Sequence, residues 1–128
     1  MKTPHKPEKA ADLALFKDIF KKHQNLFGLT GYHVYFTHAP LDADFASIEI
    51  DLENMTVNAS LNSKLPARER PYANIQREAR HEAIHLLIGR IVELAKARCI
   101  HGAELHEAAE ELVHRLDSLL PQVEQNPQ

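Results

Sequence analysis

Apolar side chains near the start of the chain repeat at helical spacing. Successive positions lie three, four and seven residues apart: Leu13, Phe16, Phe20 and Phe27. Gly28 follows directly, where a helix would end. We therefore predict a helix over residues 10–27. Residues 1–9 hold prolines and lysines with almost nothing apolar, which predicts a flexible tail.

The pattern then changes to a period of two residues. Residues 32–37, 46–52 and 55–61 each alternate apolar and polar side chains. The last two segments are separated only by Glu53 and Asn54, so we expect them to pair as a hairpin. With the first segment they predict a small, mostly antiparallel sheet of about three strands. Its apolar side needs helices to cover it.

Residues 71–99 show the longest helical pattern of the chain, after a polar connection over residues 62–71. Its expected core stripe consists of Ile84, Ile88, Ile91 and Ala95. Gly89 interrupts the pattern at a cost of about 1 kcal/mol relative to alanine, so we expect close packing there or no role.

A last helix is predicted over residues 103–120, and Pro121 is expected to stop it. Its core stripe should consist of Leu105, Ala109, Leu112, Leu116 and Leu119. Residues 122–128 read as a polar tail. The prediction is therefore a single α+β domain over residues 10–121.

Composition narrows the possible functions. The net charge of −3 and the absence of a large Lys/Arg cluster give no reason to expect nucleic acid as a partner. The single cysteine, Cys99, cannot form an internal disulfide. Apolar runs stay shorter than the roughly 18 residues of a membrane span, and residues 1–7 lack the apolar region of a signal peptide. A cytoplasmic protein of undetermined oligomeric state is expected.

The sequence His-Glu-Ala-Ile-His at residues 81–85 carries the candidate chemistry. On a helix, His81 and His85 project from one face and can reach a single zinc ion (Zn²⁺). Glu82 points elsewhere and can act as general base on a water molecule. Because both histidines lie along the edge of the apolar stripe, we expect them to be half-buried. The competing interpretation is two packing histidines with ordinary hydrogen-bond partners.

A catalytic zinc needs a third protein ligand. The metzincin pattern HExxHxxGxxH is excluded, because its glycine and third histidine positions are Ile88 and Ile91 here. The last helix and the residue before it offer further donors: His101, Glu104, His106, Glu107, Glu110, Glu111 and His114. A solvated charged face is the alternative, because Glu110 and His114 lie opposite the leucine stripe.

Residues 110–114, Glu-Glu-Leu-Val-His, resemble the second motif of gluzincins. This resemblance implies Glu110 as the third zinc ligand. It also places His114 where those families keep a side chain that orients a zinc-bound histidine, so His114 is an alternate ligand. Glu111 and Glu107 remain further alternatives. Residues 101–105, His-Gly-Ala-Glu-Leu, more weakly resemble the HGxEF stretch of SprT-like proteases, in which His101 would be the ligand.

The order of elements resembles a minimal gluzincin-type zincin, and is similar to small HExxH proteins of phages and prophages. The resemblance implies a zincin-like fold and a zinc metalloendopeptidase, with zinc on His81, His85 and Glu110 and with Glu82 as general base and acid. It also implies a peptide or protein substrate bound in extended form along the hairpin of residues 45–61. Three side chains are candidates for the oxyanion: His114, His106 and Tyr72. The alternative is a non-catalytic, zinc-stabilised protein-binding module, whose fourth coordination position would be closed.

Overall fold

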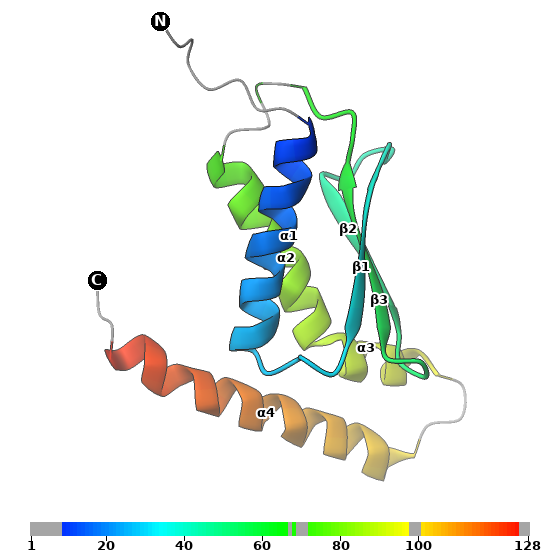
Figure 1. Ribbon diagram of the computed structural model, residues 1–128. Coiled ribbons are helices and arrows are strands. Elements are labelled where there is room, and N and C mark those ends of the chain that lie inside the picture. Colours follow the sequence, from blue (N-terminus) through cyan, green and yellow to red (C-terminus); the bar gives the residue numbers. More distant parts are fainter. Residues whose placement is uncertain (1–8, 67, 69–71, 98–100, 126–128) are drawn as a thin grey trace, which may run out of the picture.

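The computed structural model describes residues 9–66, 68, 72–97 and 101–125 of the chain (Figure 1). Its elements are, in order, α1 (Lys9–Leu26), β1 (His33–Ala39), β2 (Ala46–Asp51), β3 (Thr56–Asn62), α2 (Tyr72–Leu87), α3 (Gly89–Lys96) and α4 (Gly102–Gln125). This is an α+β architecture, as predicted: an N-terminal helix, a three-stranded sheet and three further helices. The predicted N-terminal tail lies outside the described residues except for Lys9, which begins α1.

The strands lie in the order β1-β3-β2. β2 and β3 are antiparallel, which confirms the predicted hairpin, while β1 and β3 are parallel. The predicted mostly antiparallel sheet is therefore wrong in this respect, since one of its two strand pairs is parallel. The parallel pair arises because β2 follows β1 in the chain but does not pair with it, and β3 lies between them. β3 is accordingly the central strand, and its inward side chains Val57, Ala59 and Leu61 are fully buried. β1 and β2 form the two edges.

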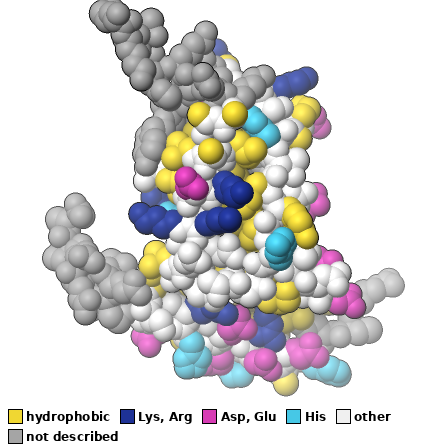
Figure 2. All heavy atoms as spheres, viewed as in Figure 1, with side chains coloured by type: hydrophobic (Ala, Val, Ile, Leu, Met, Phe, Trp, Pro, Cys, Tyr) yellow, Lys and Arg dark blue, Asp and Glu magenta, His cyan; other side chains and the backbone are white. Residues whose placement is uncertain are grey.

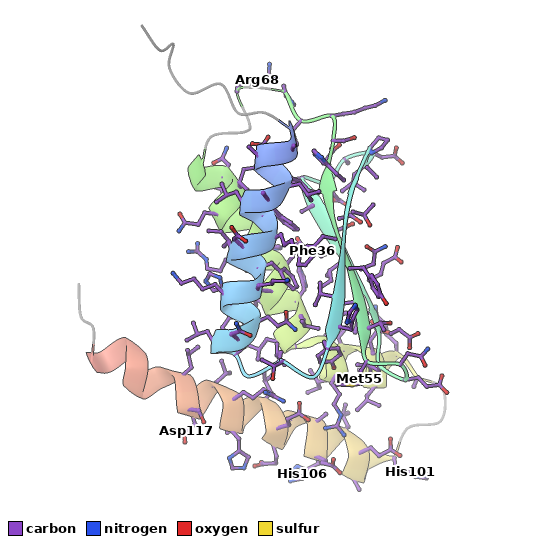
Figure 3. The ribbon with its side chains drawn as sticks, in the orientation of Figure 1. Phe36, Met55, Arg68, His101, His106 and Asp117 are labelled. Atoms are coloured by element: carbon purple, nitrogen blue, oxygen red, sulfur yellow. The ribbon has the colours of Figure 1, made fainter. Side chains whose placement is uncertain are left out.

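Two helices, α1 and α2, cover one face of the sheet (Figure 1). Phe16 and Phe20 of α1 are fully buried, as their periodicity predicts. Phe36 of β1, labelled in Figure 3, meets both rings edge to face, with ring centroids 6.3 Å and 5.5 Å away. Such aromatic pairs add about 1 kcal/mol each beyond the apolar area that they bury. The core therefore lies between α1, α2 and the sheet.

The predicted core stripe of the HExxH helix is wrong in part. Ile84 is 42% exposed, and Ala95 is exposed as well. The buried apolar side chains of α2 are instead Ile75, Ala79, Ala83 and Leu86. α1 and α2 make extensive contact, and the small side chains of Ala79 and Ala83 on the buried face of α2 favour close packing. Packing against a specific neighbour, which periodicity alone does not identify, decided which face is buried.

The predicted single helix over residues 71–99 is also wrong, because it divides at Ile88. Ile88 has φ −93° and ψ 0°, outside the α-helical region, and a new helix begins at Gly89. A Cβ atom on Gly89 would lie 2.5 Å from Cδ1 of Ile50. The missing side chain lets β2 approach the helix break, so close packing at Gly89 is confirmed.

α4 is longer than predicted. It continues through Pro121 to Gln125, so the expected stop and part of the predicted polar tail are wrong. A proline removes one backbone N–H donor, which here does not end the helix. Its expected core stripe is correct only in part. Among the side chains of α4 that the structure describes, Ala108 is the buried one at 3% exposure, whereas Leu116 is 42% exposed.

Arg115 of α4 links this helix to the end of α1. Nη1 of Arg115 donates to the backbone oxygens of Gly28, at 2.6 Å, and Phe27, at 3.1 Å. These carbonyls follow the end of α1, where helix backbone oxygens lack partners of their own. Gly28 has φ +72°, which confirms its role as the helix stop. α4 thus crosses the C-terminal end of α1 (Figure 1).

None of the helices in the described part of the chain combines the length and the apolar character that crossing a bilayer requires.

Candidate metal and active site

The two histidines of the HExxH sequence face each other on α2. Their Nε2 atoms are 3.1 Å apart, and the rings lie nearly perpendicular with centroids 4.7 Å apart. Two nitrogen ligands on a tetrahedral zinc, each at about 2.0–2.1 Å, are separated by roughly 3.3 Å. At 3.1 Å the two nitrogens are within hydrogen-bonding distance of each other, and their spacing also fits two positions of one zinc ion. Both side chains are exposed instead of half-buried as expected, because α2 turns a different face to the core.

Glu82, unlike the two histidines, is buried. Its side chain is only 5% exposed, although it neighbours an exposed histidine in sequence. Burial is the main cause that raises the pKa of Glu82 from 4.5 to about 6; the charge of His81 opposes this, and those of Glu78 and Asp44 add to it. A carboxylate with such a pKa can accept and return a proton near neutral pH.

A cavity of about 290 Å³ joins these groups to the edge of the sheet. His81, Glu82 and His85 form its wall on α2, while Asp44 and residues 46–48 form the wall on the side of β2. The backbone of an edge strand thus lies directly across from the histidine pair. The predicted HExxH centre and the hairpin that was expected to bind a peptide are adjacent.

A second cavity of about 380 Å³ continues along the same strand. It shares Ile48 and His85 with the first cavity, and it extends past Gly89 to Lys96. Its walls are β2 on one side and the end of α2 with α3 on the other. The two cavities form a groove, which we call the β2 groove, that runs from Asp44 to Lys96 along the sheet edge.

The sequence-derived third ligand, Glu110, is not brought to the histidine pair. Its carboxylate is 53% exposed, and its Oε1 lies 4.0 Å from Nε2 of His106, one turn earlier on α4. Within the described residues, no three His, Cys, Asp or Glu side chains form a group that could hold a metal ion. In this structure α4 therefore does not supply the ligand that the resemblance to gluzincins implies.

The other candidates for the third zinc ligand do not line the cavity of the histidine pair either. Glu107 and Glu111 both accept hydrogen bonds from Arg90 of α3, at 3.1 Å and 2.7 Å. His101 and His114 are exposed. Figure 2 shows acidic and histidine side chains gathered along α4, and Figure 3 shows His101 and His106 at this edge of the molecule. This is the solvated charged face that was the alternative interpretation.

Two of the three predicted oxyanion donors do not form part of the groove either. His106 and His114 are exposed on α4, and neither of them lines the β2 groove. The side chain of Tyr72 lies outside the described part of the structure.

Asp44 is the residue near the site that sequence reasoning missed. It precedes β2 and lies far from the histidines in sequence, so no spacing rule connects the two. The one available signal was an acidic turn directly before the strand expected to lie beside the metal. With two imidazoles at ligand spacing and a buried carboxylate beside them, the residues fit part of a zinc centre.

Comparisons with models of protein families, with curated proteins and with solved structures gave no match.

Proposed function

We propose that this protein is a zinc-dependent peptidase whose active centre is formed by His81, Glu82 and His85. The single observation that carries the proposal is the arrangement of these side chains across from β2. The Nε2 atoms of two exposed histidines lie 3.1 Å apart, and a carboxylate that is 5% exposed lines the same cavity. A pair of packing histidines would not need a buried carboxylate and an open groove beside it.

His81 and His85 are the residues that would hold the zinc. A zinc ion there supplies Lewis-acid chemistry: it makes a water molecule nucleophilic near neutral pH and polarises a carbonyl group. The two imidazoles contribute neutral nitrogen ligands, so the charge of the ion remains available to the reaction.

Glu82 performs the proton transfers. Its carboxylate takes a proton from the attacking water, and the resulting acid gives that proton to the departing amine as the peptide bond breaks. A pKa of about 6 suits both steps, because the group is mostly ionised at neutral pH yet is a stronger base than an exposed glutamate. Glu82 lines the cavity and is almost fully buried, which limits the rotation of its side chain.

The substrate side of the proposal rests on β2. This strand pairs with β3 on one side and is the edge of the sheet on the other. An extended peptide can form backbone hydrogen bonds with such an edge, with its side chains directed into adjoining pockets. Residues 46–48 of the strand line the cavity that holds the histidines, so a peptide added there would pass the reactive groups.

The test compares zinc content and peptide cleavage of the wild type, Glu82→Gln and Glu104→Gln. Glu82→Gln should keep zinc and lose roughly 10²- to 10⁴-fold of the cleavage rate, because the proton acceptor is gone. Glu104, exposed on α4, is the matched control and should leave both quantities unchanged. An unaltered rate in Glu82→Gln would remove the catalytic role. Zinc binding without cleavage in the wild type would instead favour the non-catalytic binding module.

A further inference from the structure

We propose that Asp44, in the turn before β2, is the third protein ligand of the zinc site. This inference rests on the proposed function, because it concerns the same centre. It replaces the ligand from α4 that the sequence resemblance implies with one from the strand side of the β2 groove.

The position of Asp44 is the first support. It lines the cavity of about 290 Å³ together with His81, Glu82 and His85, and so faces the histidine pair across the groove. Glu110, by contrast, is not among the lining residues of either cavity of the groove.

The second support is that the turn carrying Asp44 is held in place. Nδ2 of Asn62, the last residue of β3, donates to the backbone oxygens of Asp44 at 3.0 Å and Leu41 at 3.1 Å. Oδ1 of Asn62 accepts a hydrogen bond from the backbone nitrogen of Leu41 at 3.2 Å. The backbone nitrogen of Asn62 donates to the backbone oxygen of Phe45 at 3.0 Å. The turn is therefore tied to the central strand of the sheet at several points.

The chemistry of the donor set is the third support. Two imidazoles and one carboxylate form a common ligand set of catalytic zinc, which leaves a position open. Glu82 and Asp44 both bring negative charge to the cavity, and a divalent cation would neutralise them. Since no three side chains form a complete ligand group in the described residues, the Asp44 carboxylate must turn toward the histidines on binding. Its exposure leaves it free to rotate.

The neighbouring aspartate provides a matched control. Asp42 is also exposed and lies in the same turn. Both aspartates line a neighbouring cavity with Asn62 and Lys64, but only Asp44 also lines the cavity of the histidines. Asp42→Asn and Asp44→Asn remove the same charge from almost the same place in sequence. Only the second removes a donor from the wall opposite the histidines.

The experiment measures zinc affinity by competition with a chelator, and the visible absorption of the Co²⁺-loaded protein. The proteins are the wild type, Asp44→Asn, Asp42→Asn, Glu110→Gln and Asp44→His. Asp44→Asn should weaken zinc binding by more than roughly 100-fold. This is more than the loss expected for a residue that only orients a zinc ligand. Asp42→Asn and Glu110→Gln should bind as the wild type does. Asp44→His should restore binding with a changed Co²⁺ spectrum, because a nitrogen donor replaces oxygen.

Each other outcome has a definite meaning. Unchanged affinity in Asp44→Asn overturns the inference, and a loss in Glu110→Gln instead returns the ligand to α4 while the peptidase proposal stands. A wild type that binds neither zinc nor Co²⁺ overturns both proposals. The melting temperature of each metal-free variant separates lost ligation from lost folding: a metal-free Asp44→Asn that melts as the wild type does, yet binds zinc weakly, supports the inference.

Discussion

Helices α2 and α4 carry the same kinds of side chains but present them to different surroundings. α2 holds two histidines and a glutamate within five positions, and α4 holds His106, Glu110 and His114 at similar spacing. The edge strand β2 lies opposite α2, so the polar side chains of α2 line a cavity and Glu82 is buried. The corresponding side chains of α4 are exposed. A reactive centre therefore depends on what packs across from the donors as much as on the donors themselves.

Replacing one histidine on each helix gives the largest expected contrast. His81→Ala should reduce zinc affinity by more than roughly 100-fold, because one of two nitrogens at ligand spacing is lost. His106→Ala on α4 should leave the affinity unchanged. Isothermal titration with zinc measures both. Equal losses in the two variants would mean that α4 contributes to the site after all.

Burial of Glu82 predicts a pH-dependent stability difference in the metal-free protein. Since the folded-state pKa, about 6, lies above the ordinary value of 4.5, the folded state loses stability as pH rises between these values. Glu82→Gln should therefore be more stable than the wild type by about 2 kcal/mol above pH 7. The gain should vanish below pH 4.

Urea unfolding at a series of pH values, in the presence of a chelator, measures this difference. Glu110→Gln on α4, where the carboxylate is 53% exposed, should change the free energy of unfolding by less than about 0.5 kcal/mol at any pH. A Glu82→Gln gain that did not depend on pH would contradict the burial of a titrating carboxylate.

Gly89 tests how closely β2 approaches the helix that bears the histidines. Gly89→Ala places a methyl group 2.5 Å from Cδ1 of Ile50, and we expect a net destabilisation of about 1–2 kcal/mol despite the better helix propensity of alanine. Ile50→Val removes that Cδ1 atom, so the double variant should recover part of the loss. Thermal unfolding of the four proteins gives the coupling energy, and strictly additive effects would speak against the contact.

The smallest change in stability is expected for the ion pairs between α3 and α4. Arg90→Met removes the pairs with Glu107 and Glu111, and should cost about 1 kcal/mol because these groups are partly exposed. Arg77→Met, whose pair with Glu78 is 3.8 Å long, is the control and should cost less than about 0.5 kcal/mol. Zinc affinity should be unchanged in both. A loss of affinity in Arg90→Met would connect the placement of α4 to the metal site.

Local patterns predicted much of the fold. The spacing of phenylalanines identified α1, and alternation identified the three strands with the hairpin between β2 and β3. The division of the HExxH helix at Ile88 could not be found in this way. It lies beside Gly89, which packs closely against Ile50 of β2, and local patterns do not show such a contact. The buried face of that helix was predicted wrongly in part: the buried side chains include Ala79 and Ala83, whereas periodicity favoured Ile84 and Ala95.

The sequence by itself determined the elements of this protein and the histidine pair, because helical and strand periods and the i, i+4 spacing are local properties of the chain. Only the tertiary structure decided that β1 runs parallel to β3, that Glu82 is buried while the histidines are not, and that Asp44 rather than Glu110 lines the groove. These features arise from contacts between segments far apart in sequence, and such contacts follow from how the elements pack together.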